Sequence, residues 1–245
     1  MTKPTECCRL ERYKYAIYTR FREPKLYKMA VKGDWDMIPS RCLSHPKEAR
    51  YIHNYGSKDT ALHRILQAAS SMVLSEELDH ATLREMEKIK LQAVSALLEA
   101  NRMAASTADA FGRTPLHLAS MDVESCGEAA TFMMVEAHPD AAGMRDTEGR
   151  TPLHYLVARN DQIPPALLLK VLQAYPKAVD VTDIVKETPV DIVEARVEEL
   201  EDAETVLRIL KTGIFPPTKH PSQRSSSEPT TKHEVAPIST RTTST

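Results

Sequence analysis

The stretch Asp109-Ala-Phe-Gly-Arg-Thr-Pro-Leu-His117 returns 37 residues later as Asp146-Thr-Glu-Gly-Arg-Thr-Pro-Leu-His154. Eroded copies of its second half lie at Thr60-Ala-Leu-His63 and at Thr188-Pro-Val-Asp191. A fixed period of this size is typical of stacked helical repeats, in which each unit buries its apolar face against its neighbours. The sequence therefore predicts an all-α repeat stack, an architecture that offers a binding surface more often than an active site.

Each repeat carries its own helix signals. Thr is a good N-cap and Pro fits the first helical position, so a short helix is expected to begin at each Thr-Pro pair. A second helix follows, with apolar residues at helical spacing, as at Leu167, Leu168, Val171 and Leu172. Each unit thus reads as helix, loop, helix, a proline-broken exit and a turn.

The segment from Asp109 to Ala119 resembles the signature of the ankyrin repeat, and the copy from Asp146 to His154 repeats it. The resemblance covers roughly residues 26–213. It implies an ankyrin-type solenoid of about five helix-turn-helix repeats, each opened by a short hairpin turn. The residues expected to build the repeats are Thr60, His63, Gly112, Thr114, Pro115, Leu116, His117, Gly149, Thr151, Pro152, Leu153, His154, Thr188 and Pro189.

Departures from that signature are also informative. The period is 37 residues, whereas about 33 is usual for this family, so the extra residues are expected at 124–127 and 161–164, between the two helices of a unit. The unit that opens at Thr60 has a larger insertion, about 71–88, which is either an added helix or a surface loop. The last unit lacks the turn glycine and is expected to be a cap, and Trp35 is expected to cover the other end of the core.

These patterns divide the chain into three parts. The first part, residues 1–25, is a basic N-terminal segment in which a helix is possible. The repeats follow it, and the last part is a tail rich in Ser, Thr and Pro that is expected to be disordered. The predicted boundaries are 26–213 for the repeat domain as a whole, 26–56 for the N-terminal cap repeat, 57–109 for the repeat with the insertion, 110–146 and 147–183 for the two complete repeats, 184–213 for the C-terminal cap repeat and 214–245 for the tail.

Composition narrows the functional class. The net charge is −2, but residues 1–28 carry eight Lys/Arg against three Glu, and the last 32 residues carry four against two, which leaves an acidic body. An acidic body does not fit a nucleic-acid groove and would suit a basic partner. The sequence shows no apolar run long enough to cross a membrane, and Thr2 stands where myristoylation needs glycine. A monomeric cytoplasmic protein is expected, with the nucleus as the alternative location.

No catalytic, cofactor or metal motif is recognised. Cys42 and Cys126 have no partner spacing and are interpreted as structural thiols of a reducing compartment. His63, His117 and His154 share one register, but repeats stack about 10 Å apart and zinc ligands lie about 2.1 Å from one ion. The histidines are therefore interpreted as structural.

The two ends of the chain carry weaker signals. Basic and aromatic residues alternate from Arg12 to Arg22, a mixture that can bind single-stranded nucleic acid, although a capping helix with snorkelling cations is the favoured interpretation. In the tail, the segment from Arg224 to Pro229 is similar to the phosphoserine motif bound by 14-3-3 proteins, with Ser227 as the phosphorylated position.

The ankyrin resemblance implies that a protein partner meets the turn tips and the exposed edge of the first helices. The leading hypothesis is a non-enzymatic interaction scaffold or adaptor; the alternatives are a regulatory subunit or inhibitor of an enzyme that uses the same surface, and a nucleic-acid-associated regulator that uses the basic N-terminus. The predicted partner-binding residues are Gln67, Ala68, Ala110, Phe111, Arg113, Met121, Asp122, Thr147, Glu148, Arg150, Ala158 and Arg159. Phe111 stands out because a turn does not need a large apolar side chain at its tip.

Overall fold

The computed structural model describes residues 23–53, 56–72, 80–200 and 202–213. Within these residues the chain is mostly helical, and the only strand-like feature is an isolated antiparallel bridge between Ile52 and Thr60. The all-α prediction is therefore confirmed for the described part of the chain. The basic run from Arg12 to Arg22 and the tail with Ser227 lie outside the described residues.

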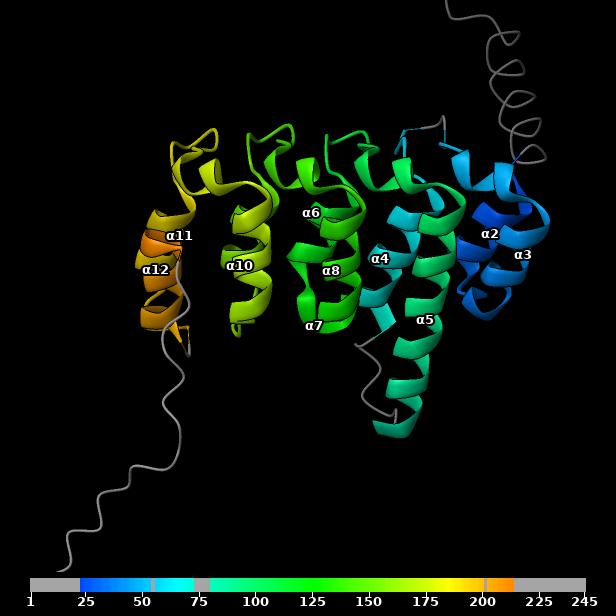
Figure 1. Ribbon diagram of the computed structural model, residues 1–245, viewed down its shortest axis with the longest axis horizontal. Helices are drawn as coiled ribbons and strands as arrows, with labels where there is room; N and C mark the ends of the chain where they lie inside the picture. The colour runs from blue at the N-terminus through cyan, green and yellow to red at the C-terminus, as the bar shows by residue number, and fades with distance from the viewer. Residues whose placement is uncertain (1–22, 54–55, 73–79, 201, 214–245) are drawn as a thin grey trace, which may run out of the picture.

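The helices form five pairs within the described residues. Figure 1 shows the pairs standing side by side in a row. The first helices contact one another in chain order and make one layer, and the second helices do the same in a second layer. The pairs are α2 (Lys25–Lys32) with α3 (Ile38–Ser44), α4 (Ala61–Met72) with α5 (His80–Ala100), α6 (Pro115–Met121) with α8 (Glu128–Ala137), α9 (Pro152–Arg159) with α10 (Pro165–Ala174), and α11 (Pro189–Ala195) with α12 (Ala203–Thr212).

Short 3-10 helices follow the second helix of four pairs and lead toward the turns. The turns lie along one edge of the row, at the top of Figure 1, and the small helix α7 (Val123–Cys126) lies at the opposite edge. The 3-10 helices are η2 (Pro46–Arg50), η3 (Arg102–Ser106), η4 (Pro139–Gly143) and η5 (Pro176–Asp180), and a further one, η1 (Trp35–Met37), joins α2 to α3.

A capping box starts the first helix of the later pairs. Thr114 is the N-cap of α6, and its backbone N–H donates to Nδ1 of His117 over 3.0 Å. In α11 an aspartate takes the place of the histidine as the acceptor, because the N–H of Thr188 donates to Oδ2 of Asp191 over 2.8 Å. The Thr N-cap and the Pro at the start of these helices are thus confirmed, and Asp191 keeps the box although the histidine is lost.

One apolar core runs through the row of pairs. Leu116 and Leu153 are fully buried, as their repeat position predicts, and they belong to the same cluster as the second-helix leucines Leu167 and Leu168. Trp35 joins this cluster at the first pair and is almost fully buried. Because neighbouring pairs share one core, each repeat is stabilised mainly by the repeats beside it.

The inserted residues are placed differently in different repeats. Residues 123–126 form the single helical turn α7, whereas the matching residues 160–163 lie in the loop between α9 and α10. In the repeat that opens at Thr60, residues 80–88 belong to the 21-residue helix α5, which projects beyond the row in Figure 1. The described part of that insertion is therefore an extension of existing helices, neither an added helix nor a surface loop, and 73–79 lie outside the described residues.

Candidate interaction surfaces

Three turns along one edge of the row share one construction. Asp109 is buried, and its Oδ1 accepts hydrogen bonds from the backbone N–H groups of Phe111 and Arg113 over 2.8 and 2.9 Å. Asp146 and Asp183 make the same pair of bonds in the next two turns. Because the aspartate side chain holds the backbone two and four residues on, each turn is fixed by its own sequence.

Backbone hydrogen bonds also join one turn to the next. The N–H of Thr147 donates to the carbonyl of Phe111 over 2.9 Å, and the N–H of Ile184 donates to the carbonyl of Glu148 over 2.9 Å. Gly112 has a φ of +75°, and a Cβ at this position would lie 3.1 Å from the Cα of Asp146. Glycine is required there both by the backbone conformation and by the close approach of the next turn.

Lys186 occupies the turn position that glycine occupies at Gly112 and Gly149, and it adopts the same left-handed conformation, with a φ of +68°. A residue with a Cβ is destabilised in this conformation by about 1–2 kcal/mol. We therefore expect Lys186→Gly to raise the free energy of unfolding by about 1 kcal/mol. Urea denaturation would measure this change, with Lys177→Gly as a control on a nearby 3-10 helix; a loss of stability in Lys186→Gly would contradict the expected strain.

Apolar side chains are exposed at two of the three turn tips. We define the turn-tip surface as the two central residues of each turn: Ala110, Phe111, Thr147, Glu148, Ile184 and Val185. Phe111 is 58% exposed, and the Ile184 and Val185 side chains are 67% and 61% exposed. The guanidinium of Arg113 lies 4.7 Å from the centre of the Phe111 ring.

Ile184 and Val185 were missed by the sequence prediction, although they hold the register of Ala110 and Phe111. The signal that could have found them was the 37-residue period itself, which places them at the same turn tip. Because Lys186 replaces the turn glycine, the similarity of this turn to the two earlier turns is less evident in the sequence. The turn-tip surface therefore carries large exposed apolar side chains at its first turn and at its third turn, and polar ones at the turn between them.

The predicted arginines of this surface are bound within the fold. Arg113 makes an ion pair of 2.8 Å with the buried Asp109 of its own turn. Arg150 pairs with Glu148 at 2.8 Å and with Asp183 of the next turn at 3.4 Å. Removal of Arg150 would leave the buried Asp183 without this cation, so Arg150 is a poor position for testing partner binding alone.

The remaining predicted residues lie away from the turn tips. Those of the third and fourth helix pairs lie at or just beyond the C-terminal ends of α6 and α9, at the edge opposite the turns in Figure 1, whereas the two of α4 lie in the second half of that helix. These residues are Gln67, Ala68, Met121, Asp122, Ala158 and Arg159. The structure therefore divides the predicted partner-binding residues into two separate groups.

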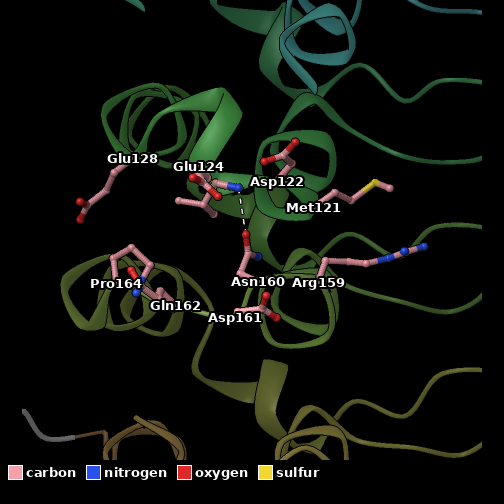
Figure 2. A pocket seen from close by; sticks show the side chains of 10 residues that line it. Met121, Asp122, Glu124, Glu128, Arg159, Asn160, Asp161, Gln162 and Pro164 are labelled. Carbon is pink, nitrogen blue, oxygen red and sulfur yellow. Dashed lines mark hydrogen bonds between the residues drawn. The ribbon is translucent and has the colours of Figure 1, made fainter. Parts of the chain in front are cut away.

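Part of the second group lines a pocket of about 720 Å³. Figure 2 shows this pocket between the end of α6 with α7 and the loop that joins α9 to α10. Met121, Asp122 and Arg159 were predicted; the other lining residues, Val123, Glu124, Glu128, Asn160, Asp161, Gln162 and Pro164, were not. Several of these belong to the inserted residues, for which the family resemblance offers no guide.

The structural interpretation of the histidines fits their contacts. Nε2 of His63 lies 3.1 Å from the carbonyl oxygen of Arg113, and Nε2 of His117 lies 3.2 Å from that of Arg150, so each ring bridges to the following turn. His154 keeps the contact with Thr151, but its Nε2 makes no hydrogen bond with a described residue. No group of three or more metal-ligating side chains occurs among the described residues.

The two described cysteines are buried thiols. Burial raises the pKa of Cys42 to about 11 and that of Cys126 to about 12. Both thiols are therefore protonated near neutral pH, and the thiolate needed for nucleophilic attack is scarce.

Within the described residues, no helix is long and apolar enough to span a bilayer.

No protein-family model matches this chain, and no curated protein matches it. What the chain binds therefore has to be inferred from its own surfaces.

Proposed function

We propose that the chain is an ankyrin-type repeat stack that works as a non-enzymatic interaction module and holds a protein partner on its turn-tip surface. The recurring Thr-Pro-Leu-His boxes, the row of helix pairs and the repeated turns support this proposal. The 37-residue period and the inserted helical turn make it a long-period variant of that architecture.

The observation that carries the proposal is the exposure of Phe111, Ile184 and Val185 on turns that are internally fixed. Large apolar side chains at turn tips do not stabilise the turns, whereas their burial under a partner would remove apolar area from water. The turns are held by buried aspartates and by bonds from turn to turn. Since little backbone freedom remains to be lost, binding there has a small entropic cost.

Replacement of Phe111 and Ile184 by serine tests this surface. We expect the double variant Phe111→Ser/Ile184→Ser to lose at least about tenfold in partner capture, because buried aromatic and aliphatic anchors dominate interface energies. The full chain would be used as bait and its partners quantified by mass spectrometry. The melting temperature should stay within about 2 °C of the parent, since exposed substitutions change stability by no more than about 0.5 kcal/mol each.

A matched control is available on the second helices and the 3-10 helices that follow them. Leu43 and Met103 are also exposed apolar side chains, and neither belongs to a turn. Leu43→Ser/Met103→Ser should retain the partners that Phe111→Ser/Ile184→Ser loses. Equal capture by both double variants would show that the turn tips are not the interface. If a captured partner is an enzyme whose activity the chain alters, the inhibitor alternative gains support on the same surface.

A further inference from the structure

The pocket at the edge opposite the turns is strongly acidic. Four carboxylates line it, those of Asp122, Glu124, Glu128 and Asp161, against the single lining guanidinium of Arg159, and one of the four, Asp161, is also paired with Arg196 of the next repeat at 3.0 Å. Among the described residues, Glu124 and Glu128 make no ion pair or side-chain hydrogen bond. A concave site lined by one sign of charge attracts the opposite charge. The lining therefore favours a cation.

The next junction along the row shows which cation this kind of site accommodates. Arg196 follows α11, and its guanidinium donates to the carbonyl of Val157 over 2.7 Å and to Oδ1 of Asp161 over 3.0 Å. A third bond, of 3.3 Å, reaches the carbonyl of Asn160. At that junction an arginine of the following repeat thus closes the end of α9 and neutralises the acidic residue after it.

At the pocket, 37 residues earlier in the sequence, the corresponding arginine does not make these contacts. Arg159 corresponds to Arg196, and Glu124 corresponds to Asp161, each 37 residues before. Arg159, however, is exposed, and Figure 2 shows it extending away from Glu124. It makes no ion pair or hydrogen bond with any described residue.

Asn160 accounts for this difference. Its Nδ2 donates to the carbonyl of Ser120 over 2.9 Å, and its Oδ1 accepts from the N–H of Val123 over 2.9 Å. Ser120 corresponds to Val157, so the amide takes a carbonyl that a guanidinium takes one repeat later. The end of α6 is thereby closed by a neutral group, and the Glu124 carboxylate is left without a cation.

We propose that this pocket binds the guanidinium of an arginine side chain supplied by a partner protein. Arginine is favoured over lysine because its planar group donates several hydrogen bonds at once to carboxylates and is less strongly hydrated. The pocket is larger than a guanidinium alone, which leaves space for the aliphatic part of the side chain. This site shares no residue with the turn-tip surface, so a test of one proposal does not decide the other.

The test is a titration of the full chain, observed by amide NMR, with a capped Gly-Arg-Gly peptide and its lysine and citrulline counterparts. We expect the arginine peptide to shift the amide signals of Val123, Asn160 and Gln162, at millimolar concentrations. Lysine should bind at least about fivefold more weakly, because a point charge cannot form the paired bonds, and citrulline should not bind. Equal binding of the three peptides, or of arginine and lysine, would overturn the assignment.

Two charge-matched variants locate the site. Glu124→Gln/Glu128→Gln should weaken the arginine peptide at least about fivefold, since it removes the two carboxylates that lack a cation. Glu85→Gln/Glu204→Gln removes two exposed carboxylates elsewhere and should leave binding unchanged. An equal loss in both variants would indicate attraction by net charge alone, and no loss in the first would place the peptide elsewhere; either result would refute the pocket.

Discussion

Leu116→Ala should lower the free energy of unfolding by about 3–5 kcal/mol, the upper part of the range measured for buried leucines. Leu116 is 0% exposed and lies in α6, which contacts α4 on one side and α9 on the other. Because helices on both sides are held by their own neighbours, the cavity left by the substitution cannot collapse easily. Urea denaturation followed by circular dichroism at 222 nm, a helix signal, would measure the loss.

Leu43→Ala is the matched control for this substitution. The Leu43 side chain is 85% exposed in α3, so the same chemical change should alter stability by no more than about 0.5 kcal/mol. If Leu116→Ala also costs less than about 1 kcal/mol, the described core does not hold the repeats together. A fall in the denaturant slope without a shift in the main transition would mean that single repeats unfold separately.

The parts of the fold that were predictable are those encoded within a few adjacent residues. A Thr followed by Pro, with His or Asp three residues after the Thr, contains both halves of a capping box, and the structure starts α6, α9 and α11 there. The burial of Leu116 and Leu153 follows equally directly, because each sits at a fixed position after the cap. Local chemistry decides these features, so one sequence is sufficient to predict them.

Features that depend on contacts between repeats were harder to predict. In the pocket, Asn160 rather than the adjacent Arg159 bonds to the end of α6, and the sequence does not show which of two adjacent side chains makes that contact. The insertion at about 71–88 is predicted to be an added helix or a surface loop, whereas its described residues extend α4 and α5; Leu, Glu and Lys suit a helix extension as well as a separate helix, so composition does not distinguish the two. The division of the partner-binding residues into two groups likewise required the path of the first helices in space.

The histidines of the repeat should make stability depend on pH. His117 is fully buried, and its Nδ1 accepts the N–H of Thr114 over 3.0 Å, a role open only to the unprotonated nitrogen. Burial lowers the pKa of His117 to about 4. Burial also lowers the pKa of His63 and of His154, where the same contact recurs. All three rings are therefore neutral in the folded chain near neutral pH.

The direction of the effect follows from these lowered values. The unfolded chain binds protons at the ordinary histidine pKa of about 6.5, while the folded chain resists them. The contribution of His117 is therefore fully present above about pH 6.5 and is lost as the pH falls toward 4. A shift of this size corresponds to a loss on the order of 3 kcal/mol at the acid end. Urea denaturation at about pH 7, 6 and 5 would measure this slope.

His117→Gln separates this histidine from the carboxylates, some of which also titrate toward the acid end. Glutamine at the third helical position retains the capping-box pattern with Thr114 but cannot take up a proton in this range. The variant should be less stable than the parent near neutral pH, where the bridge to Arg150 is lost, and the difference should shrink as the pH falls. A constant difference from about pH 7 to 5 would mean that the proton is not taken up at His117 on unfolding. A shrinking difference would establish that His117, which completes the capping box of α6, also contributes to the loss of stability in acid.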